Sequence, residues 1–168
     1  MPIDLGHIYD QHAQALFAFL LNLTRSEAET RDILQDLFAR LAARPGLLDQ
    51  ARNTRSYLIR LAHNLAIDGH RRRSRETAAH ERTGRELYSV FSISPDPDEA
   101  AFRGRLAEAL GELPPEQRAV VHLKLWEEMT FAQISDALDI PLNTAASRYR
   151  YGIDKLQTHL RPLYEEIR

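Results

Sequence analysis

Two groups of polar side chains have the types and the spacing that suit contact with nucleic acid. The first is a basic run, His70 to Arg75, in which four arginines stand within six positions and could neutralise phosphates. The second covers residues 143–150, where amide, hydroxyl and guanidinium groups suit base edges and phosphates alike. A basic run is equally typical of a solvated helix end, so the elements that carry both groups decide what they do.

The second group is preceded by a short predicted helix. Thr130 and Gln133 have the spacing of a capping box, which marks a helix start. Asp139 tolerates left-handed backbone and Pro141 lacks a backbone donor, so the helix should stop near Leu138 and a turn should follow. Apolar residues repeat on one face of this helix, at Phe131, Ile134 and Leu138.

A second helix should restart at Leu142 or Asn143, with Ala146, Ile153 and Leu156 facing inward. The two helices and their turn then form a helix-turn-helix, whose second helix enters a DNA groove. An ordinary amphipathic hairpin of a helical core shows the same pattern. The side chains left for DNA are Asn143, Thr144, Ser147, Arg148 and Arg150.

Composition excludes several other classes of protein. The 168 residues include no cysteine, so disulfides and thiolate metal sites are impossible, which fits a reducing cytoplasm. The seven histidines form no HExxH or other tight ligand pair and are expected at the surface or partly packed, and no metal or cofactor is predicted. No apolar run reaches membrane length and no signal peptide is visible, so we expect a cytoplasmic protein without membrane contact.

The net charge of −2 conceals a strong asymmetry along the chain. Residues 51–82 hold eight arginines against three acids, whereas residues 1–50 hold four arginines against seven acids. Residues 83–116 are also acidic, and residues 117–168 balance at seven of each sign. A local basic patch can bind phosphates while the rest of the molecule meets a protein partner.

Helical periodicity runs through the chain, and two small helical domains are predicted, giving an all-α fold. The first, residues 1–75, is a bundle of three helices: one from about Asp4 to Leu23, one from a Ser26 cap to about Arg44, and one capped by Thr54 that runs into the arginines. Residues 76–98 have the proline and acid content of a linker. The second domain, residues 99–168, holds four helices and ends with the helix-turn-helix.

Three segments in this order resemble the sigma-70 family, and within it the extracytoplasmic-function (ECF) sigma factors. Arg31–Leu41, RDILQDLFARL, resembles the helix that grips the clamp of RNA polymerase. Ser56–Arg73 resembles the segment that opens and reads the −10 element. Leu113–Lys124 and the helix-turn-helix beyond it resemble region 4, which reads the −35 element. The order of the three is far more specific than any one of them.

The resemblance implies roles for individual residues. Core polymerase binding falls to an acidic and apolar helix face, which suits a basic coiled coil: Asp32, Gln35, Asp36 and Phe38. The −10 signature falls on Asn64, Asp68, Arg71, Arg72 and Arg73, and the −35 contacts on the residues of the second group above.

Structural alternatives stay open for several of these residues. Phe38 can simply be core, Asp68 can pair with Arg71 or Arg72, and Tyr57, where the family commonly has Trp, is more easily core than a base-stacking surface. In the linker, Asp96, Asp98 and Glu99 either mimic nucleic acid or belong to a plain tether. The chain departs from the family at Asp139 and Asn143, where Gly is common, at Ala145, where a larger aliphatic residue is usual, and at Ser135, often Ala.

The resemblance implies a non-enzymatic factor that binds the clamp and flap of core RNA polymerase and promoter DNA, with an anti-sigma factor as a further partner. Two other functions fit the same residues. A free-standing helix-turn-helix regulator would bind duplex DNA alone as a dimer. A sigma-like adaptor would sequester an anti-sigma factor through its protein-binding faces.

Overall fold

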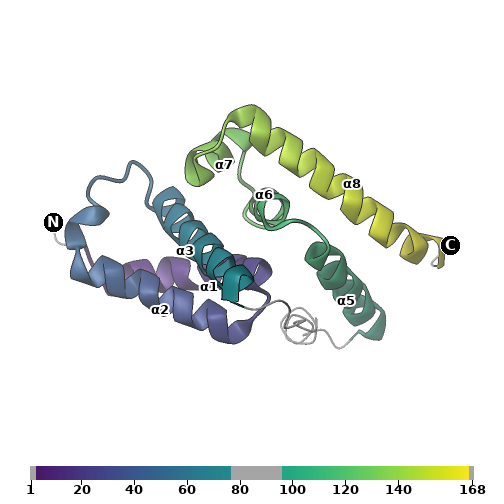
Figure 1. Cartoon of the computed structure of the whole chain (residues 1–168), viewed down its shortest axis with the longest axis horizontal. Coiled ribbons are helices and arrows are strands. Elements are labelled where there is room, and N and C mark those ends of the chain that lie inside the picture. Colours follow the sequence, from purple (N-terminus) through teal and green to yellow (C-terminus); the bar gives the residue numbers. More distant parts are fainter. Residues whose placement is uncertain (1–2, 77–95, 167–168) are drawn as a thin grey trace.

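The computed structural model describes residues 3–76 and 96–166, and every regular element in these ranges is a helix, as the all-α prediction requires (Figure 1). The N-terminal half contains α1 (Leu5–Thr24), α2 (Glu27–Ala43), the 3-10 helix η1 (Pro45–Leu47) and α3 (Thr54–Glu76). The C-terminal half contains α5 (Pro97–Gly111), α6 (Pro115–Leu125), α7 (Phe131–Leu138) and α8 (Leu142–Glu166). No helix in the described ranges is long and apolar enough to cross a membrane.

Polar caps set where the first three helices begin. The Asp4 carboxylate accepts the backbone N–H of Gly6 at 3.0 Å, and the Ser26 hydroxyl accepts that of Glu29 at 3.3 Å. The prediction that Thr54 caps the third helix is wrong, because Thr54 is already helical. The Asn53 side chain instead accepts the Ser56 N–H at 3.0 Å. Asn is as good a cap as Thr and lies one residue earlier.

The helix-turn-helix forms as the sequence predicts. Thr130 and Gln133 make both hydrogen bonds of the capping box, at 2.9 and 3.1 Å, and Asp139 ends α7 in the left-handed region at φ 55°. α8 then begins at Leu142. The predicted inner face is wrong at one position, since Ala145 is fully buried and Ala146 only half-buried. The small side chain at 145 sits against the core where the family usually has a larger one.

The end of the predicted linker is wrong as well. Residues 77–95 lie outside the described residues, but α5 already begins at Pro97. Asp96 caps it by accepting the Asp98 N–H at 3.0 Å, and Glu99 pairs with Arg103 at 2.6 Å. The proline and the acids that resemble a linker are here the first turn of a helix, where both are favoured.

The two halves pack against one another and share a hydrophobic core. α6 lies on α1 and α7 lies on α3, so the halves stand side by side in Figure 1. Buried residues of both halves meet in one cluster, among them Leu16, Phe19 and Leu58 with Val120, Leu123, Met129 and Ile134. A smaller cluster joins α5, α6 and α8 through Leu110, Leu113, Val121 and Leu156.

A glycine controls how closely α8 approaches α6. A Cβ atom built on Gly152 would lie 2.6 Å from Cγ2 of Val121, a distance that real side chains do not adopt. Glycine inside a helix destabilises it by about 1 kcal/mol relative to alanine. The close contact between the two helices therefore depends on this residue.

Candidate polymerase and nucleic-acid interfaces

The acidic face of α2 is open to solvent. Asp32, Gln35 and Asp36 are all exposed, and their spacing of three and four residues places them on one side of the helix. Asp36 also pairs with Arg40 one turn on, at 3.3 Å, in a geometry that contributes little to stability at such exposure. The three polar residues predicted to meet polymerase thus form one accessible stripe.

Phe38 occupies a different position from these three. Its ring is partly buried and meets Tyr9 of α1 edge to face, with ring centroids 5.0 Å apart. Tyr9 is 49% exposed and borders a pocket of about 360 Å³ between α1 and α2. The pocket is lined by Tyr9, Asp10, Ala13, Gln14, Phe17 and Leu34. Phe38 therefore packs at the edge of the core, beside this pocket. Most residues that line the pocket belong to α1, which lies outside the Arg31–Leu41 segment.

The predicted −10 residues share an exposed stripe of α3, with one exception. Asn64, Asp68, Arg71 and Arg72 are exposed, and among the described residues no ion pair joins Asp68 to either arginine. Arg73 differs because it forms an ion pair with Glu29 of α2. Partial burial, with the neighbouring charge of Arg72, lowers the pKa of Arg73. Arg73 thus also ties α3 to α2.

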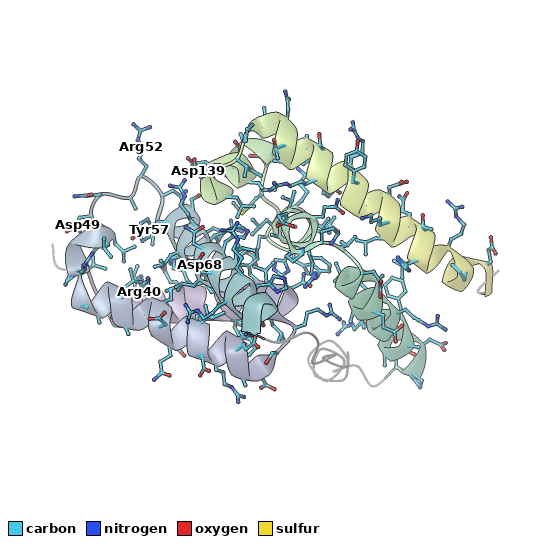
Figure 2. All side chains as sticks on the ribbon, in the orientation of Figure 1. Arg40, Asp49, Arg52, Tyr57, Asp68 and Asp139 are labelled. Atoms are coloured by element: carbon cyan, nitrogen blue, oxygen red, sulfur yellow. The ribbon has the colours of Figure 1, made fainter. Side chains whose placement is uncertain are left out.

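A polar pocket that the sequence analysis missed lies where the α2–α3 connection meets α7. It measures about 360 Å³ and is lined by Leu47, Gln50, Ala51, Arg52, Asn53, Ser56, Tyr57, Arg60 and Asp136. Figure 2 shows Arg52 on the connection and Tyr57 at the start of α3. Tyr57 is half-buried, so its ring both packs on the core and faces the pocket. Donors, acceptors and an aromatic ring in one concavity are what an unstacked base requires.

α7 closes one side of this pocket. Arg60 of α3 donates to the backbone oxygens of Asp136 and Ala137, the latter at 3.3 Å. Asp136 is also among the residues that line the pocket, so the C-terminal half contributes to a site formed mainly by the N-terminal half. A nearby pair joins Arg55 to Glu127, with the guanidinium 2.8 Å from the carboxylate and 2.6 Å from the Glu127 backbone oxygen.

The predicted −35 residues lie on the first turns of α8. Asn143 and Arg150 are exposed, whereas Thr144, Ser147 and Arg148 are half-buried. Arg150 lies over the ring of Tyr151, with its guanidinium carbon 5.2 Å from the ring centroid. The Ser135 hydroxyl donates to the Ile140 oxygen at 2.5 Å and so holds the turn before α8. The serine that departs from the family pattern thus fixes this turn.

The charge of Arg148 in the recognition helix acts on His63 of α3. His63 of α3 is largely buried, and burial is the main cause that lowers its pKa. Glu116 opposes this effect, and the positive charge of Arg148 adds to it. α7, the first helix of the helix-turn-helix, packs on α3, so the helix-turn-helix and the helix with the predicted −10 residues are in contact.

The contact between α1 and α6 is polar and almost fully buried. Asn22 is 1%, His122 3% and Arg118 6% exposed. The Asn22 amide donates to Nδ1 of His122 at 3.0 Å, which leaves the imidazole proton on Nε2. Arg118 donates to the backbone oxygens of Asn22 and Leu23 at 2.8 and 3.1 Å and to Leu113 at 2.9 Å, and so caps the C-terminal end of α1.

Burial also changes the ionisation of these groups. It lowers the pKa of His122 to about 4, so the ring is neutral at pH 7. Burial, with the nearby charge of Arg25, lowers the pKa of Arg118 to about 10, and the guanidinium stays charged. Arg25 itself donates to the Ala107 oxygen of α5 at 2.9 Å. The expectation that His122 is a surface or partly packed residue is wrong, because α1 covers it.

The described ranges contain no group of three or more histidines, aspartates or glutamates that could hold a metal ion.

Comparison with known proteins gives a consistent identification. Residues 8–76 match the family described as Sigma-70 region 2, and residues 103–156 match Sigma-70, region 4. The chain is 32% identical to the ECF RNA polymerase sigma factor SigL of Mycobacterium tuberculosis over 93% of this chain and 88% of SigL. It is 30% identical to the ECF sigma factor SigK of Mycobacterium sp. strain KMS over 91% of this chain and 81% of SigK.

A solved structure with the same fold is the sigma factor RpoE of Bartonella quintana in complex with the anti-sigma factor NepR. It superposes with a TM-score of 0.72 at 19% identity, over 93% of this chain and 96% of that one. The protein described above belongs to the sigma-70 family, in the class of ECF RNA polymerase sigma factors. Proteins of this family are non-catalytic initiation factors that bind core RNA polymerase and promoter DNA.

Proposed function

We propose that three surfaces of this chain divide the work of promoter-specific initiation. The exposed stripe of α2, with Phe38 and Tyr9 beside it, docks on the polymerase clamp. The exposed stripe of α3 and the pocket beside Tyr57 hold unstacked bases of the −10 element. The first turns of α8 read the −35 element. Trapping of these bases as the DNA duplex opens uses binding energy alone, so no nucleotide hydrolysis is needed.

The observation that best supports this proposal is the helix-turn-helix itself. Both hydrogen bonds of its capping box are present, the Ser135 hydroxyl donates to the backbone oxygen of Ile140 in the turn, and Asn143 and Arg150 are exposed on the second helix. A rigid α8 can present donors to a DNA groove without further ordering. The stripe on α3 strengthens the case, because four polar residues with no role in the core stand together on one helix face.

The test combines co-elution with core RNA polymerase and a gel shift of duplex DNA from upstream of the chain's own gene. We expect co-elution, and a shift only when core is present. A shift by the protein alone, without co-elution, would favour a free-standing regulator. Alanine at both Asp32 and Phe38 should abolish co-elution, whereas alanine at the exposed Arg105 of α5 should not.

Matched arginines on α8 test the −35 assignment. Arg150 and Arg161 are both exposed on this helix, but only Arg150 lies on the turns that follow the helix-turn-helix turn. Arg150→Ala should weaken promoter binding by the holoenzyme. Loss of a phosphate contact would also reduce the salt dependence of binding, whereas loss of a base contact would relax the preference at one base pair. Arg161→Ala should leave both unchanged. Equal effects of the two changes would contradict the assignment.

An anti-sigma factor is a further proposed partner. The B. quintana RpoE of the same fold is bound by the anti-sigma factor NepR. If this chain were instead an adaptor that only sequesters such a factor, it would bind the factor but would not start transcription with core polymerase. A run-off transcription assay on the upstream DNA separates the two functions.

A further inference from the structure

Tyr151 is an exposed aromatic residue of α8 that lies among the predicted −35 residues without being one of them. Within the described ranges, the large apolar and aromatic side chains with substantial exposure are Tyr9, Leu125, Trp126, Leu142 and Tyr151. Tyr151 is 53% exposed. Single exposed apolar residues are common on protein surfaces, so the neighbours of this ring decide whether it has a role.

Tyr151 stands in the middle of the helix face that carries the predicted −35 residues. It follows Thr144, Ser147 and Arg148 by seven, four and three residues, which are the spacings that bring side chains to one side of a helix. Those three residues are half-buried, whereas Tyr151 is exposed. The ring is therefore the most accessible of the four side chains to a DNA groove that α8 enters.

Arg150 lies against this ring. Its guanidinium carbon is 5.2 Å from the ring centroid, a distance at which a cation and an aromatic face attract one another. A side chain that is already held in place loses less conformational freedom when it contacts DNA. Tyr151 and Arg150 thus present an apolar and a cationic surface side by side.

The chemistry of the ring selects among the four bases. In the major groove, thymine presents a methyl group, whereas the other bases present only hydrogen-bond donors and acceptors. An exposed ring gains free energy when it removes such a methyl group from water. A tyrosine hydroxyl lacks the paired donors with which arginine reads guanine, and it lacks the amide that reads adenine.

We propose that Tyr151 is a specificity-determining residue of the −35 contact, and that it recognises a thymine through its 5-methyl group. The inference rests on the function proposed above and names a base that α8 selects. Leu142 provides the matched comparison, because it is exposed to nearly the same extent, 52%, on the same helix. It precedes Tyr151 by nine residues, or two and a half turns, and so lies on the opposite side of α8.

Uracil tests this contact at the level of one group, because it is thymine without the 5-methyl group and pairs identically. The run-off start site locates the −35 element in the upstream DNA. Each thymine of that element, on either strand, is then replaced in turn by uracil. Binding is measured for the holoenzyme of core RNA polymerase with the full-length parent chain and with Tyr151→Ala, Tyr151→Phe and Leu142→Ala.

In the parent holoenzyme, uracil at one position should weaken binding about fourfold, which is the effect of one buried group of this size. Y151F keeps the ring and L142A keeps Tyr151, so both should show the same preference for thymine. Y151A should bind the thymine and uracil promoters equally well. Thermal unfolding of Y151A and L142A should match the parent, because both positions are exposed.

Three results would overturn the inference: no uracil effect at any thymine in the parent, the same effect in Y151A, or its loss in L142A. The proposed function would still stand in these cases if the parent binds the thymine promoter only with core polymerase and Arg150→Ala weakens that binding. If the parent holoenzyme does not bind the upstream DNA, the proposed function fails and the inference fails with it.

Discussion

The helix-turn-helix and the contact between α1 and α6 are built in opposite ways. In the helix-turn-helix, Thr130, Gln133 and Ser135 find their partners within the same motif, and the inner face is apolar. In the interdomain contact, buried polar groups meet across a distance of about a hundred residues in sequence, and several of their atoms lack a partner among the described residues. The first arrangement makes the helix-turn-helix self-contained, whereas in the second the buried polar groups of each half depend on the other half for their partners.

Protonation of His122 should have the largest effect on stability, because it places a positive charge in the buried centre of the interdomain contact. Burial lowers the pKa of this ring from 6.5 to about 4, so stability is complete above pH 6.5 and is lost as pH falls from 6.5 towards 4. The loss should approach about 3 kcal/mol as the pH nears 4, because burial leaves a protonated ring desolvated and each unit of pKa shift corresponds to about 1.4 kcal/mol. Urea unfolding at pH 7.5 and 5.0 measures the loss, of which about 2 kcal/mol is expected at pH 5.0.

His122→Gln is the control for this pH effect, since glutamine keeps hydrogen-bonding groups without the titration. Burial also lowers the pKa of His12 and of His63, so part of the acid sensitivity should remain in the variant. Identical pH dependence in parent and variant would show that His122 does not carry the effect.

Gly152→Ala should break the C-terminal unit itself. The new methyl group would collide with Val121 at the closest contact between α8 and α6. Overpacking should destabilise the protein by about 2 kcal/mol, after a partial gain from helix propensity. Gly46→Ala is the matched control, because a Cβ at Gly46 meets no atom within 4 Å. Thermal unfolding compares the two, and equal shifts would exclude the close approach as the cause.

Thr130→Ala tests the locally satisfied region with a smaller expected effect. It removes the capping box of α7 and should reduce stability by about 1 kcal/mol. Hydrogen exchange should accelerate in α7 and the first turns of α8 more than across the α1–α6 contact. Thr158→Ala, which removes only an exposed hydroxyl bond to the Asp154 oxygen, should change neither. Uniform acceleration throughout the chain would mean that the two regions are not separate in stability.

Local signals in the sequence account for most of what was predicted correctly. Capping residues and the left-handed preference of Asp139 fix where helices begin and end, and each acts within a few residues. The error at Thr54 arises because two good capping residues, Asn53 and Thr54, are adjacent in the sequence. The error at the start of α5 arises because proline and acidic residues are common both in linkers and in the first turn of a helix. The individual roles of the DNA-reading and polymerase-binding residues stay predictions.

Residues that act across the interface could not be assigned from local patterns. Asn22 interrupts an apolar run of α1, and Arg118 and His122 lie four residues apart on a buried face of α6. A polar residue on an apolar face signals a polar partner, but the sequence does not say which helix supplies it. The pocket beside Tyr57 was missed for the same reason, because α7 contributes one of its walls.

The most direct test of the proposed function is run-off transcription from the upstream DNA by core polymerase with the parent chain, with Asp32 and Phe38 both changed to alanine, and with Arg105→Ala as the control. We expect transcription with the parent chain and with Arg105→Ala, and none with the Asp32 and Phe38 double variant. No transcription with the parent chain, or undiminished transcription with the double variant, would contradict the proposed function.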